Sequence, residues 1–357
     1  MSRFQYIYRV REFQSIPRGR WFCGGEQGGP RSFLSENTAR SLSGLTQPKV
    51  CTLGLSARDL ARARDFADRH KIANAYGSYL ELAADCHVDV AYIGVVIPCH
   101  YEATKLMLHA GKHVLCEKPL ALNRKQAQEM VDLARAKNLF LMEGVWSRCF
   151  PIYQRLREEL AKETIGRPLQ ITTHVCLSVE NAWKWKRRAN GGGAALGLGV
   201  YPIQLALLVF KEKPEEVKAI GHLSDEDVDV GTSVCMQFSG GRFCMFNVDL
   251  RYKGVNSATI YGTEGKLELP ERMLTPSALV TPSGTIEIPL PRPRDDRLAS
   301  YESSTGFSYI ADTVRDCIIS GQTECHLMTL EETLTISSIT DAIRQQIGVS
   351  YEGDTEI

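Results

Sequence analysis

Reactive or polar side chains follow three short apolar runs of the chain, in each case directly after the run ends. The three groups are Pro98-Cys99-His100 after Val90 to Ile97, Glu117-Lys118-Pro119 after His113 to Cys116, and Glu143 to Trp146 after Leu139 to Met142. Apolar runs of this length are typical of strands buried on both faces of a parallel sheet. Because ligands bind beyond the carboxyl ends of such strands, the three groups are candidates for one small-molecule site.

Lys118 is the residue of these groups with the most specific chemistry. It ends a nearly uncharged strand, and Pro119 restricts its backbone. An ammonium group held there can lower the pKa of a neighbouring proton donor or polarise a substrate oxygen. Considered by itself, a lysine after a strand is also typical of an ordinary surface position.

A second set of candidates surrounds the glycine run at 191–193, which opens a helix that carries Tyr201. The preceding segment, Trp183 to Arg188, interleaves basic and aromatic residues, a pattern that can bind single-stranded nucleic acid by stacking. However, 42 basic residues balance 42 acidic ones, so no wider basic surface is expected. We interpret the segment as a loop that borders a substrate pocket, and we expect no nucleic-acid partner.

The elements that would position these residues alternate between strand and helix patterns from Leu60 to Met142. The expected inner faces of three helices are Leu60, Ala63 and Ala67; Ala103, Leu106, Met107 and Ala110; and Ala127, Met130, Val131 and Ala134. Strand, helix and strand follow one another without interruption. This order predicts an α/β domain built on a doubly wound, Rossmann-type parallel sheet.

After Trp146 the pattern changes to alternating segments joined by short turns. Gly240-Gly241 and Thr263-Glu264-Gly265 each separate two such segments, as hairpin turns would. An α+β domain with a mostly antiparallel, open sheet is therefore predicted. The proline-rich segment from 270 to 304 is interpreted as a long excursion, and two closing helices are expected near 309–319 and 330–347.

These patterns predict three parts of the chain. Residues 1–20 are expected to form an N-terminal extension without a fixed place in the fold, residues 21–145 an atypically begun dinucleotide-binding domain, and residues 146–350 a domain for substrate binding and dimerisation. The five arginines of the first twenty residues, against one acidic residue, also weakly resemble an organellar transit segment.

The combination of Glu117-Lys118-Pro119 with the glycine run and Tyr201 resembles the glucose-fructose oxidoreductase and inositol dehydrogenase (Gfo/Idh/MocA) family. Within it, the chain is most similar to the dimeric trans-dihydrodiol dehydrogenases, also described as NADP-dependent D-xylose dehydrogenases. The likeness extends from about Ser56 to about Ile347 and includes Ala57 to Asp59, Ala75 to Tyr79, Cys116 to Pro119, Leu141 to Glu143 and Gly191 to Tyr201.

The resemblance implies hydride transfer between a carbon of a diol or sugar and C4 of NADP. Tyr201 would be the proton donor and Lys118 would assist it, while Glu117 and Pro119 would contact the cofactor together with Lys118. The family further implies a cytoplasmic homodimer formed through the exposed face of the second sheet.

Three further residues, His100, Trp146 and Arg148, match positions that line the family's substrate pocket. Considered singly, each has a structural explanation: a helix-start residue for His100, a core residue of the domain interface for Trp146 and a surface charge for Arg148.

The residues after the second expected strand bear on the choice of cofactor. Arg58, with Arg62 one turn later, stands where an acidic residue would bind the ribose hydroxyls of NAD. Two guanidinium groups can bind a 2′-phosphate, so NADP is favoured. Asp59 leaves NAD as an alternative, and so does the interpretation of both arginines as solvent-facing residues.

Two departures from the family pattern put activity in question. Gly24 and Gly25 are the candidates for the phosphate-binding loop, but their spacing does not match G-x-G-x-x-G, and Glu26 would repel a phosphate. The family places an aspartate four residues before the tyrosine, where this chain has Gly197. An alternative to an active dehydrogenase is therefore a silent member that binds a dinucleotide or a protein partner.

Other features limit the remaining classes of protein. The eleven cysteines have no CxxC pair and no zinc-type spacing, which favours buried thiols in a reducing compartment and no metal. The most apolar stretch, from 194 to 210, includes two glycines, a proline and a glutamine. It is interpreted as a buried helix, so no membrane partner is expected.

Overall fold

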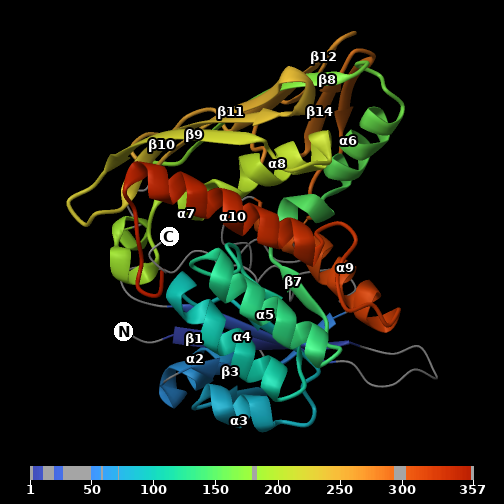
Figure 1. The fold of residues 1–357 in the computed structure, drawn as a ribbon. Helices are drawn as coiled ribbons and strands as arrows, with labels where there is room; N and C mark the ends of the chain where they lie inside the picture. The colour runs from blue at the N-terminus through green and yellow to red at the C-terminus, as the bar shows by residue number, and fades with distance from the viewer. Residues whose placement is uncertain are drawn as a thin grey trace. The chain divides into compact units, whose positions relative to one another are not determined.

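A computed structural model describes residues 3–10, 20–26, 50–57, 59–70, 72–178, 183–292 and 303–354; before residue 56, and at 57, 183 and 184, it describes only the backbone. The chain divides into two compact units (Figure 1). Unit 1 comprises Met1–Ala121, Lys125–Trp146 and Leu290–Leu330, and unit 2 comprises Leu122–Arg124, Ser147–Pro289 and Glu331–Ile357.

Unit 1 contains a seven-stranded sheet in the order β4-β3-β1-β2-β5-β6-β7. Its strands are β1 (Arg3–Val10), β2 (Arg20–Glu26), β3 (Val50–Ala57), β4 (Asn74–Tyr76), β5 (Val90–Ile93), β6 (His113–Cys116) and β7 (Leu141–Glu143). Every neighbouring pair is parallel except those that involve β1, which is antiparallel to β2 and β3. The predicted Rossmann-type sheet is confirmed, with β1 as an antiparallel insertion.

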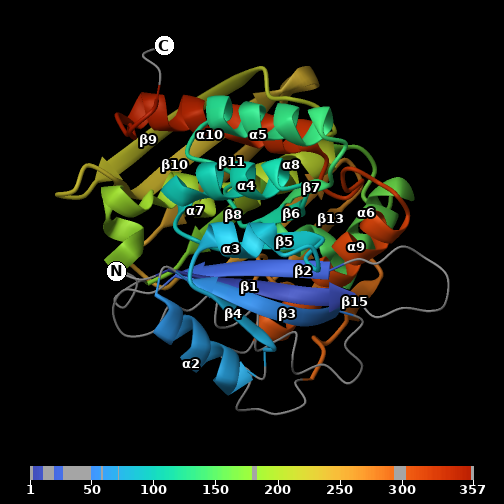
Figure 2. The same ribbon diagram turned by 90° about the horizontal axis from the view of Figure 1, so that it is seen from below.

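Strand β1 gives part of the N-terminal segment a place inside the sheet, between β2 and β3 (Figure 2). Phe4 pairs with Gly25 of β2 and with Ala57 of β3. For residues 3–10 the structure therefore differs from the expected extension without a fixed place. The aromatic and β-branched residues of this segment, Phe4, Tyr6, Ile7 and Tyr8, favour a strand. Its high arginine content had suggested only a weak resemblance to an organellar transit segment.

Helices cover the sheet of unit 1, as a parallel sheet requires. They are α2 (Leu60–His70), α3 (Tyr79–Ala84), α4 (His100–His109), α5 (Arg124–Ala136) and α9 (Phe307–Ile319). α2 packs against β3 and β4, and α4 against β5 and β6. The predicted inner face of α5, formed by Ala127, Met130, Val131 and Ala134, is completely buried. Because α9 contacts β3, it belongs to unit 1, although the sequence pattern placed it in the second domain.

Unit 2 contains an eight-stranded sheet in the order β15-β14-β13-β12-β8-β11-β10-β9. Its strands are β8 (Pro168–Cys176), β9 (Glu216–Leu223), β10 (Asp229–Phe238), β11 (Arg242–Asp249), β12 (Ser257–Gly262), β13 (Lys266–Leu269), β14 (Ala278–Thr281) and β15 (Gly284–Glu287). Only β8 and β11 pair in parallel. The predicted antiparallel sheet and its two hairpins, β10–β11 and β12–β13, are confirmed.

The prediction that residues 270–304 form a long excursion is wrong for the first half of this segment. β14 and β15 form a further hairpin there, which continues the sheet from β13. The alternation of buried and half-buried positions in β14 extends over only four residues. So short an alternation between prolines is a weak strand signal in the sequence.

The helices of unit 2 are α6 (Pro151–Ala161), α7 (Ala194–Leu198), α8 (Val200–Phe210) and α10 (Leu330–Ile347). α7 packs against β10 and β11, and α8 against β8. The stretch from Arg188 to Phe210 is long and apolar enough to cross a membrane, but its apolar window is wholly buried in the structure. It is therefore a core helix, as the sequence indicated, and α9 and α10 lie where the two closing helices were expected.

Candidate active-site residues

The three groups of candidate residues in unit 1 follow neighbouring strands that end at the same level. Ile93 of β5 pairs with Cys116 of β6, and Cys116 pairs with Glu143 of β7. Each of these residues is the last of its strand. The strand ends next to these groups therefore share one edge of the sheet, although β5 ends at Ile93 and not at the expected Ile97, and Glu143 is itself the last residue of β7.

Glu117 and Lys118 form a charged pair of neighbours at this edge, and both are buried. Oε1 of Glu117 accepts a hydrogen bond from the Tyr92 hydroxyl, and Oε2 accepts one from the backbone N–H of Lys118 at 3.2 Å. Burial raises the pKa of the Glu117 carboxyl, while the hydrogen bond from Tyr92 and the charge of Lys118 act in the opposite direction. The Lys118–Pro119 peptide bond is cis.

Gly144 allows the chain after β7 to pass close to this pair. Its N–H donates to the carbonyl oxygen of Cys116 at 2.6 Å. A Cβ atom on Gly144 would lie 3.0 Å from that oxygen and 3.2 Å from Cα of Glu117. On the other side of the same loop, the N–H of Leu120 donates to Oε1 of Glu143 at 3.0 Å. The end of β7 thus holds both ends of the Glu117–Pro119 segment.

His100 connects the loop after β5 to the loop after β6. Its Nδ1 lies 2.8 Å from the carbonyl oxygen of Pro119 and its Nε2 2.9 Å from that of Val95. Burial lowers the pKa of the imidazole, and the charge of Lys118 acts in the same direction. Both ring nitrogens therefore face backbone oxygens, an arrangement that positions the loops. The predicted contact of His100 with substrate stays a prediction.

Trp146 is the last residue of unit 1 before the chain enters unit 2. Its ring lies 4.3 Å from the ring of Phe307, centre to centre, and the side chain is only 6% exposed. This contact is what a core residue would make, and a role in the substrate pocket stays a prediction.

In unit 2, Tyr201 lies in the first turn of α8 and is buried. One turn later, Gln204 donates through Nε2 to the backbone oxygen of Tyr201 at 3.0 Å and to the hydroxyl of Tyr153 at 2.7 Å. Arg148 donates to the side-chain and backbone oxygens of Gln204, the latter at 2.7 Å, and to Glu332 at 2.9 Å. The guanidinium group predicted to line the substrate pocket is therefore bonded to the helix that carries Tyr201.

The backbone N–H groups of the glycine run before α7 bind the loop that precedes it. Gly193 donates to the carbonyl oxygen of Trp185 at 2.8 Å, Gly192 to that of Arg187 at 3.0 Å, and Gly191 to that of Arg188 at 2.9 Å. A Cβ atom on Gly192 would lie 2.6 Å from the Trp185 oxygen. The absence of a side chain here lets the preceding loop pack on the start of the helix.

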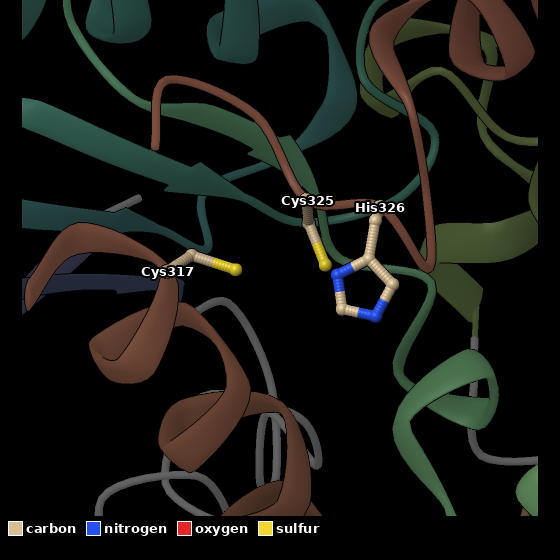
Figure 3. Close-up of side chains that lie close together, drawn as sticks. All are labelled: Cys317, Cys325 and His326. Carbon is tan, nitrogen blue, oxygen red and sulfur yellow. The ribbon is translucent and has the colours of Figure 1, made fainter. Parts of the chain in front are cut away.

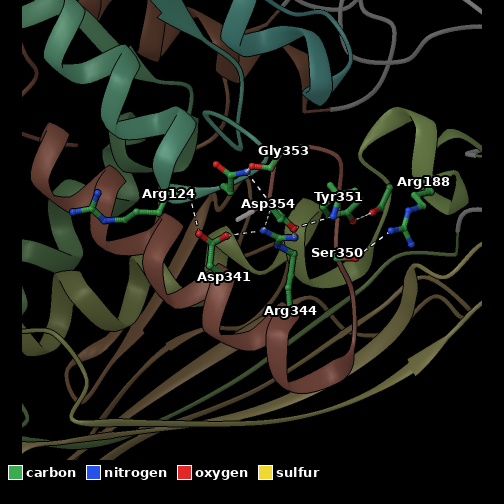
Figure 4. Close-up of polar contacts among 10 residues, drawn as sticks. Arg124, Arg188, Asp341, Arg344, Ser350, Tyr351, Gly353 and Asp354 are labelled. Atoms are coloured by element: carbon green, nitrogen blue, oxygen red, sulfur yellow. Dashed lines mark hydrogen bonds and ion pairs between the residues drawn. The ribbon is translucent and has the colours of Figure 1, made fainter. Parts of the chain in front are cut away.

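The C-terminal segment holds the glycine run from another direction (Figure 4). The hydroxyl of Tyr351 donates to the carbonyl oxygen of Gly192. Arg344 binds Asp341 and Asp354 at 2.7 Å each, and Asp354 accepts the N–H of Tyr351 at 2.8 Å. An ion-pair network therefore fixes the segment that anchors the glycine run.

Gly197 in α7 lies four residues before Tyr201, with the ring of Trp185 against it. A Cβ atom on Gly197 would lie 2.1 Å from Cζ3 and 2.6 Å from Cε3 of Trp185. The tryptophan ring thus occupies the space in which a side chain at position 197 would begin. Sequence reasoning identified Gly197 as a departure but did not connect it with Trp185, although both belong to the same short stretch.

The candidates for binding the rest of the cofactor are only partly described. Gly24 and Gly25 lie inside strand β2, paired with Gln5 and Phe4 of β1, and not in a loop. Arg58 lies outside the described residues. Arg62 is in the first turn of α2. A role of these residues in cofactor binding remains a prediction.

Asp59, the residue that kept NAD as an alternative, is exposed at the start of α2. Its Oδ1 accepts the N–H groups of Ala61 at 2.9 Å and of Arg62 at 3.3 Å. This is the geometry of a helix N-cap. One carboxylate oxygen is therefore engaged by the helix that it caps.

Comparison with known proteins gives two family matches. Residues 35–145 match the oxidoreductase family with an NAD-binding Rossmann fold (GFO_IDH_MocA), and residues 153–268 match a GFO/IDH/MocA C-terminal domain. The trans-1,2-dihydrobenzene-1,2-diol dehydrogenase of Xenopus tropicalis is 36% identical, with 89% of this chain and 96% of the relative covered. The human protein of the same name is also 36% identical, with 90% and 96% covered.

Solved structures share the fold. A 3-ketoreductase from Actinomadura kijaniata in complex with NADP and TDP-benzene has a TM-score of 0.72 at 23% identity, with 88% of this chain and 94% of that chain covered. A levoglucosan dehydrogenase in complex with NADH and levoglucosan has a TM-score of 0.73 at 18% identity, with 89% and 95% covered. At these identities the likeness shows the fold alone.

Proposed function

The chain belongs to the Gfo/Idh/MocA family of oxidoreductases, and on that premise we propose that it is an NADP-dependent dehydrogenase that oxidises a trans-dihydrodiol or an aldose such as D-xylose. The observation that carries the proposal is the buried pair Glu117 and Lys118 at the carboxyl edge of a Rossmann-type sheet, held by His100 and Glu143. A desolvated ammonium at this edge is suited to reaction chemistry and adds little to packing.

The carboxyl edge of the unit 1 sheet, where β5, β6 and β7 end together, supports the proposal of a dinucleotide site. Glu117, Lys118 and Pro119 would contact the nicotinamide end, and Arg58 and Arg62 the adenosine end. The N-cap geometry of Asp59 supports NADP over NAD, because one oxygen of its carboxylate faces its own helix instead of a ribose. The chemistry that bound NADP supplies is the acceptance of a hydride from the substrate carbon.

The protein's own groups would handle the proton and the substrate. Tyr201 would accept the proton of the reacting hydroxyl in the oxidative direction and donate it in the reverse direction. The ammonium of Lys118 would favour the phenolate form of Tyr201 by lowering its pKa. Trp146 would border the substrate, whereas His100 and Arg148 would position the loops and the helix that carry these groups.

The names of the relatives support the diol as substrate, since the trans-1,2-dihydrobenzene-1,2-diol dehydrogenases of Xenopus tropicalis and human cover nearly the whole chain. The aldose remains part of the proposal because the resemblance seen in the sequence extends to D-xylose dehydrogenases.

We also propose a cytoplasmic homodimer that forms through the open face of the second sheet. Phe243 and Met245 of β11 and Tyr261 of β12 are exposed on strands that flank β8. Gln170 of β8 pairs with Phe243 on one side and with Tyr261 on the other. The side chains of Phe243, Gln170 and Tyr261 therefore form one row across the three strands. Large apolar side chains gathered on one sheet face are typical of a protein interface.

The test is a measurement of cofactor binding and turnover on the same preparation. NADPH fluorescence gives the dissociation constant, and absorbance of the reduced cofactor follows oxidation of a trans-dihydrodiol and of D-xylose with NADP or NAD. Turnover with NADP supports the proposal. A protein that binds NADPH but oxidises neither substrate contradicts it.

The second candidate function is a silent family member that binds a dinucleotide or a protein partner. It is favoured by Gly197, which supplies no carboxylate beside Tyr201, and by the position of Gly24 and Gly25 inside a strand. Binding of NADPH without turnover would support it, and turnover of either substrate would exclude it.

A further inference from the structure

An aromatic ring fills the space in which a side chain at position 197 would begin. Cζ3 of Trp185 lies 2.1 Å from the point where Cβ of a residue at position 197 would be, closer than any two such atoms approach. Gly197 and the ring of Trp185 therefore depend on each other: a side chain at 197 must displace the ring.

The loop that carries Trp185 is held in place through its backbone. The N–H of Gly193 donates to the carbonyl oxygen of Trp185 at 2.8 Å, and that of Gly192 to Arg187 at 3.0 Å. Gly192 is in turn anchored by the hydroxyl of Tyr351. These backbone hydrogen bonds hold the loop and so fix the position of the Trp185 ring.

Tyr201 and Gly197 lie on the same side of the helix, because residues four apart are neighbours on a helix surface. Gly199 between them has helical angles, φ −60° and ψ −25°, so the turn is continuous. Side chains on a helix lean toward its N-terminus, which directs the phenol of Tyr201 over the turn that contains Gly197. The phenol of Tyr201 is therefore expected to extend toward the turn against which the indole of Trp185 packs.

We propose that Trp185 forms an aromatic wall of the substrate site beside Tyr201 and selects a flat, cyclic, sparsely hydroxylated diol over an aldose. This inference rests on the proposed function and names its substrate class. An aromatic ring stacks on a flat unsaturated ring. It offers no strong acceptor to a hydroxyl group, and a sugar hydroxyl buried against it would lose its hydrogen bond to water.

The experiment uses three variants, Trp185→Ala, Trp185→Phe and the double variant Trp185→Ala with Gly197→Asp, each checked for folding by thermal unfolding. The ratio of kcat/KM for a trans-dihydrodiol to that for D-xylose is the readout. Trp185→Ala removes the ring on which the diol would stack, and a hydroxyl group of the sugar is no longer buried against an indole that cannot bind it. Together these two effects predict that the ratio falls by about ten- to a hundredfold. Trp185→Phe keeps an aromatic ring and should keep most of the ratio, while the double variant should lower it further.

A binding measurement separates this inference from the proposed function. Catechol, a flat aromatic diol without an oxidisable carbinol carbon, is titrated calorimetrically into the NADP-saturated protein. Binding weakened about tenfold or more by Trp185→Ala but not by Trp185→Phe supports the aromatic wall even if the wild type turns over neither substrate. Unchanged catechol binding together with an unchanged substrate ratio in Trp185→Ala overturns it, even if the wild type is an active dehydrogenase.

A different observation in unit 1 carries a second inference, independent of the reaction. Ligand atoms of Cys317, Cys325 and His326 all lie within 4.8 Å of one another. Cys317 comes from α9 and the other two from the loop that follows it, and Figure 3 shows the two thiols and the imidazole turned toward a common point. The thiols are buried and the histidine is exposed, so an ion could enter from solvent.

We infer that these three residues form a binding site for a soft divalent ion of the Zn²⁺ class. Thiolates and imidazole are the preferred ligands of zinc. Donor atoms around one tetrahedral zinc lie about 3.5 to 3.8 Å apart, so a contraction of about 1.3 Å at most would close the site. No metal was expected from the sequence, because the cysteines have no zinc-type spacing; the turn after α9 brings Cys317 and Cys325 together.

The test is titration of the reduced, full-length protein with Co²⁺, followed by competition with Zn²⁺. One equivalent should produce a thiolate-to-cobalt charge-transfer band and tetrahedral d–d absorption, both displaced by zinc. Cys317→Ser, Cys325→Ser and His326→Ala should each weaken binding about tenfold or more, in keeping with loss of one ligand. Cys86→Ser is the matched control, since Cys86 lies in a separate exposed group with Asp85 and His87. No thiolate band, or a band lost in Cys86→Ser and kept in Cys317→Ser, overturns the inference.

Discussion

Arg148 binds Gln204 at both its side-chain and its backbone oxygen, and Gln204 in turn donates to the backbone oxygen of Tyr201. The guanidinium group, 4% exposed, thus reaches the candidate proton donor through a single intermediate residue. A residue that was expected at the substrate pocket is in this way part of the support of the helix behind it.

The first prediction concerns this support. Arg148→Met should lower the free energy of unfolding by roughly 3 kcal/mol, because it removes a buried donor that binds Gln204 and Glu332. It should lower kcat more than it raises KM, since Tyr201 loses its positioning. The control is Arg155→Ala, which breaks a half-exposed pair with Glu158 and should cost less than about 1 kcal/mol. Equal urea midpoints for the two variants would contradict the assignment of Arg148 as a support of the helix that carries Tyr201.

The second prediction concerns the two candidate catalytic groups. Lys118→Met and Tyr201→Phe should each lower kcat by roughly 10²- to 10⁴-fold, since each removes a group that handles the proton. Circular dichroism and thermal unfolding should show an intact fold, because both substitutions keep a buried side chain of similar size. Cofactor reduction followed in a spectrophotometer is the measurement. If either variant kept wild-type turnover, the proposed acid–base roles would be refuted.

The third prediction is a dependence of stability on pH that originates at His100. Burial lowers the pKa of this imidazole in the folded state below its ordinary value of 6.5. The unfolded state therefore binds the proton first. The contribution of His100 to the free energy of unfolding should be complete above pH 6.5. It should decrease as the pH falls from 6.5 toward the folded-state pKa, by at most about 1.4 kcal/mol per pH unit.

Urea unfolding of the wild type and of His100→Gln, measured from pH 7.5 to pH 5, checks this expectation. The glutamine amide keeps a donor for one of the backbone oxygens of Val95 and Pro119, but it does not titrate. The wild type should lose stability more steeply than the variant. Parallel pH profiles would show that His100 is not the source.

The fourth prediction tests the close approach at Gly144. Gly144→Ala places a methyl group 3.0 Å from the Cys116 oxygen and 3.2 Å from Cα of Glu117, and both are backbone atoms that cannot move aside cheaply. We expect a loss of about 1 to 3 kcal/mol in unfolding free energy, together with reduced activity because the Glu117–Lys118 segment shifts. Gly77→Ala, whose added methyl would have no neighbour closer than 3.5 Å, should change stability by less than about 1 kcal/mol. Indistinguishable melting temperatures would speak against the tight contact.

The fifth prediction concerns the proposed homodimer. Met245→Glu places a charge in the middle of the open sheet face, where Met245 is 40% exposed and pairs with Thr172 and Cys235. It should convert the dimer to monomer, because a desolvated charge at an interface is costly. Light scattering after size exclusion gives the mass. Leu80→Glu, on the exposed side of α3 in unit 1, is the control, and a dimer that survives Met245→Glu would exclude this face.

Much of the fold could be predicted because it depends on periodicity. The inner face of α5 and the buried strand β6 were both recognisable from the order of apolar residues, since a helix repeats every 3.6 residues and a strand every two. β1 and the β14–β15 hairpin were missed. β1 contains arginines, and β14 and β15 are four-residue strands close to prolines; all three are strands because neighbouring strands pair with them.

The sequence by itself identified the candidate residues and the elements that carry them: Lys118 directly after strand β6, and Tyr201 in a helix that follows the glycine run. These are properties of residue type and local order. Only the tertiary structure decided what surrounds them. Arg148 binds Gln204, His100 faces two backbone oxygens, and Trp185 fills the space at Gly197. Contacts between residues distant in the chain depend on packing in three dimensions, which no local pattern in one sequence encodes.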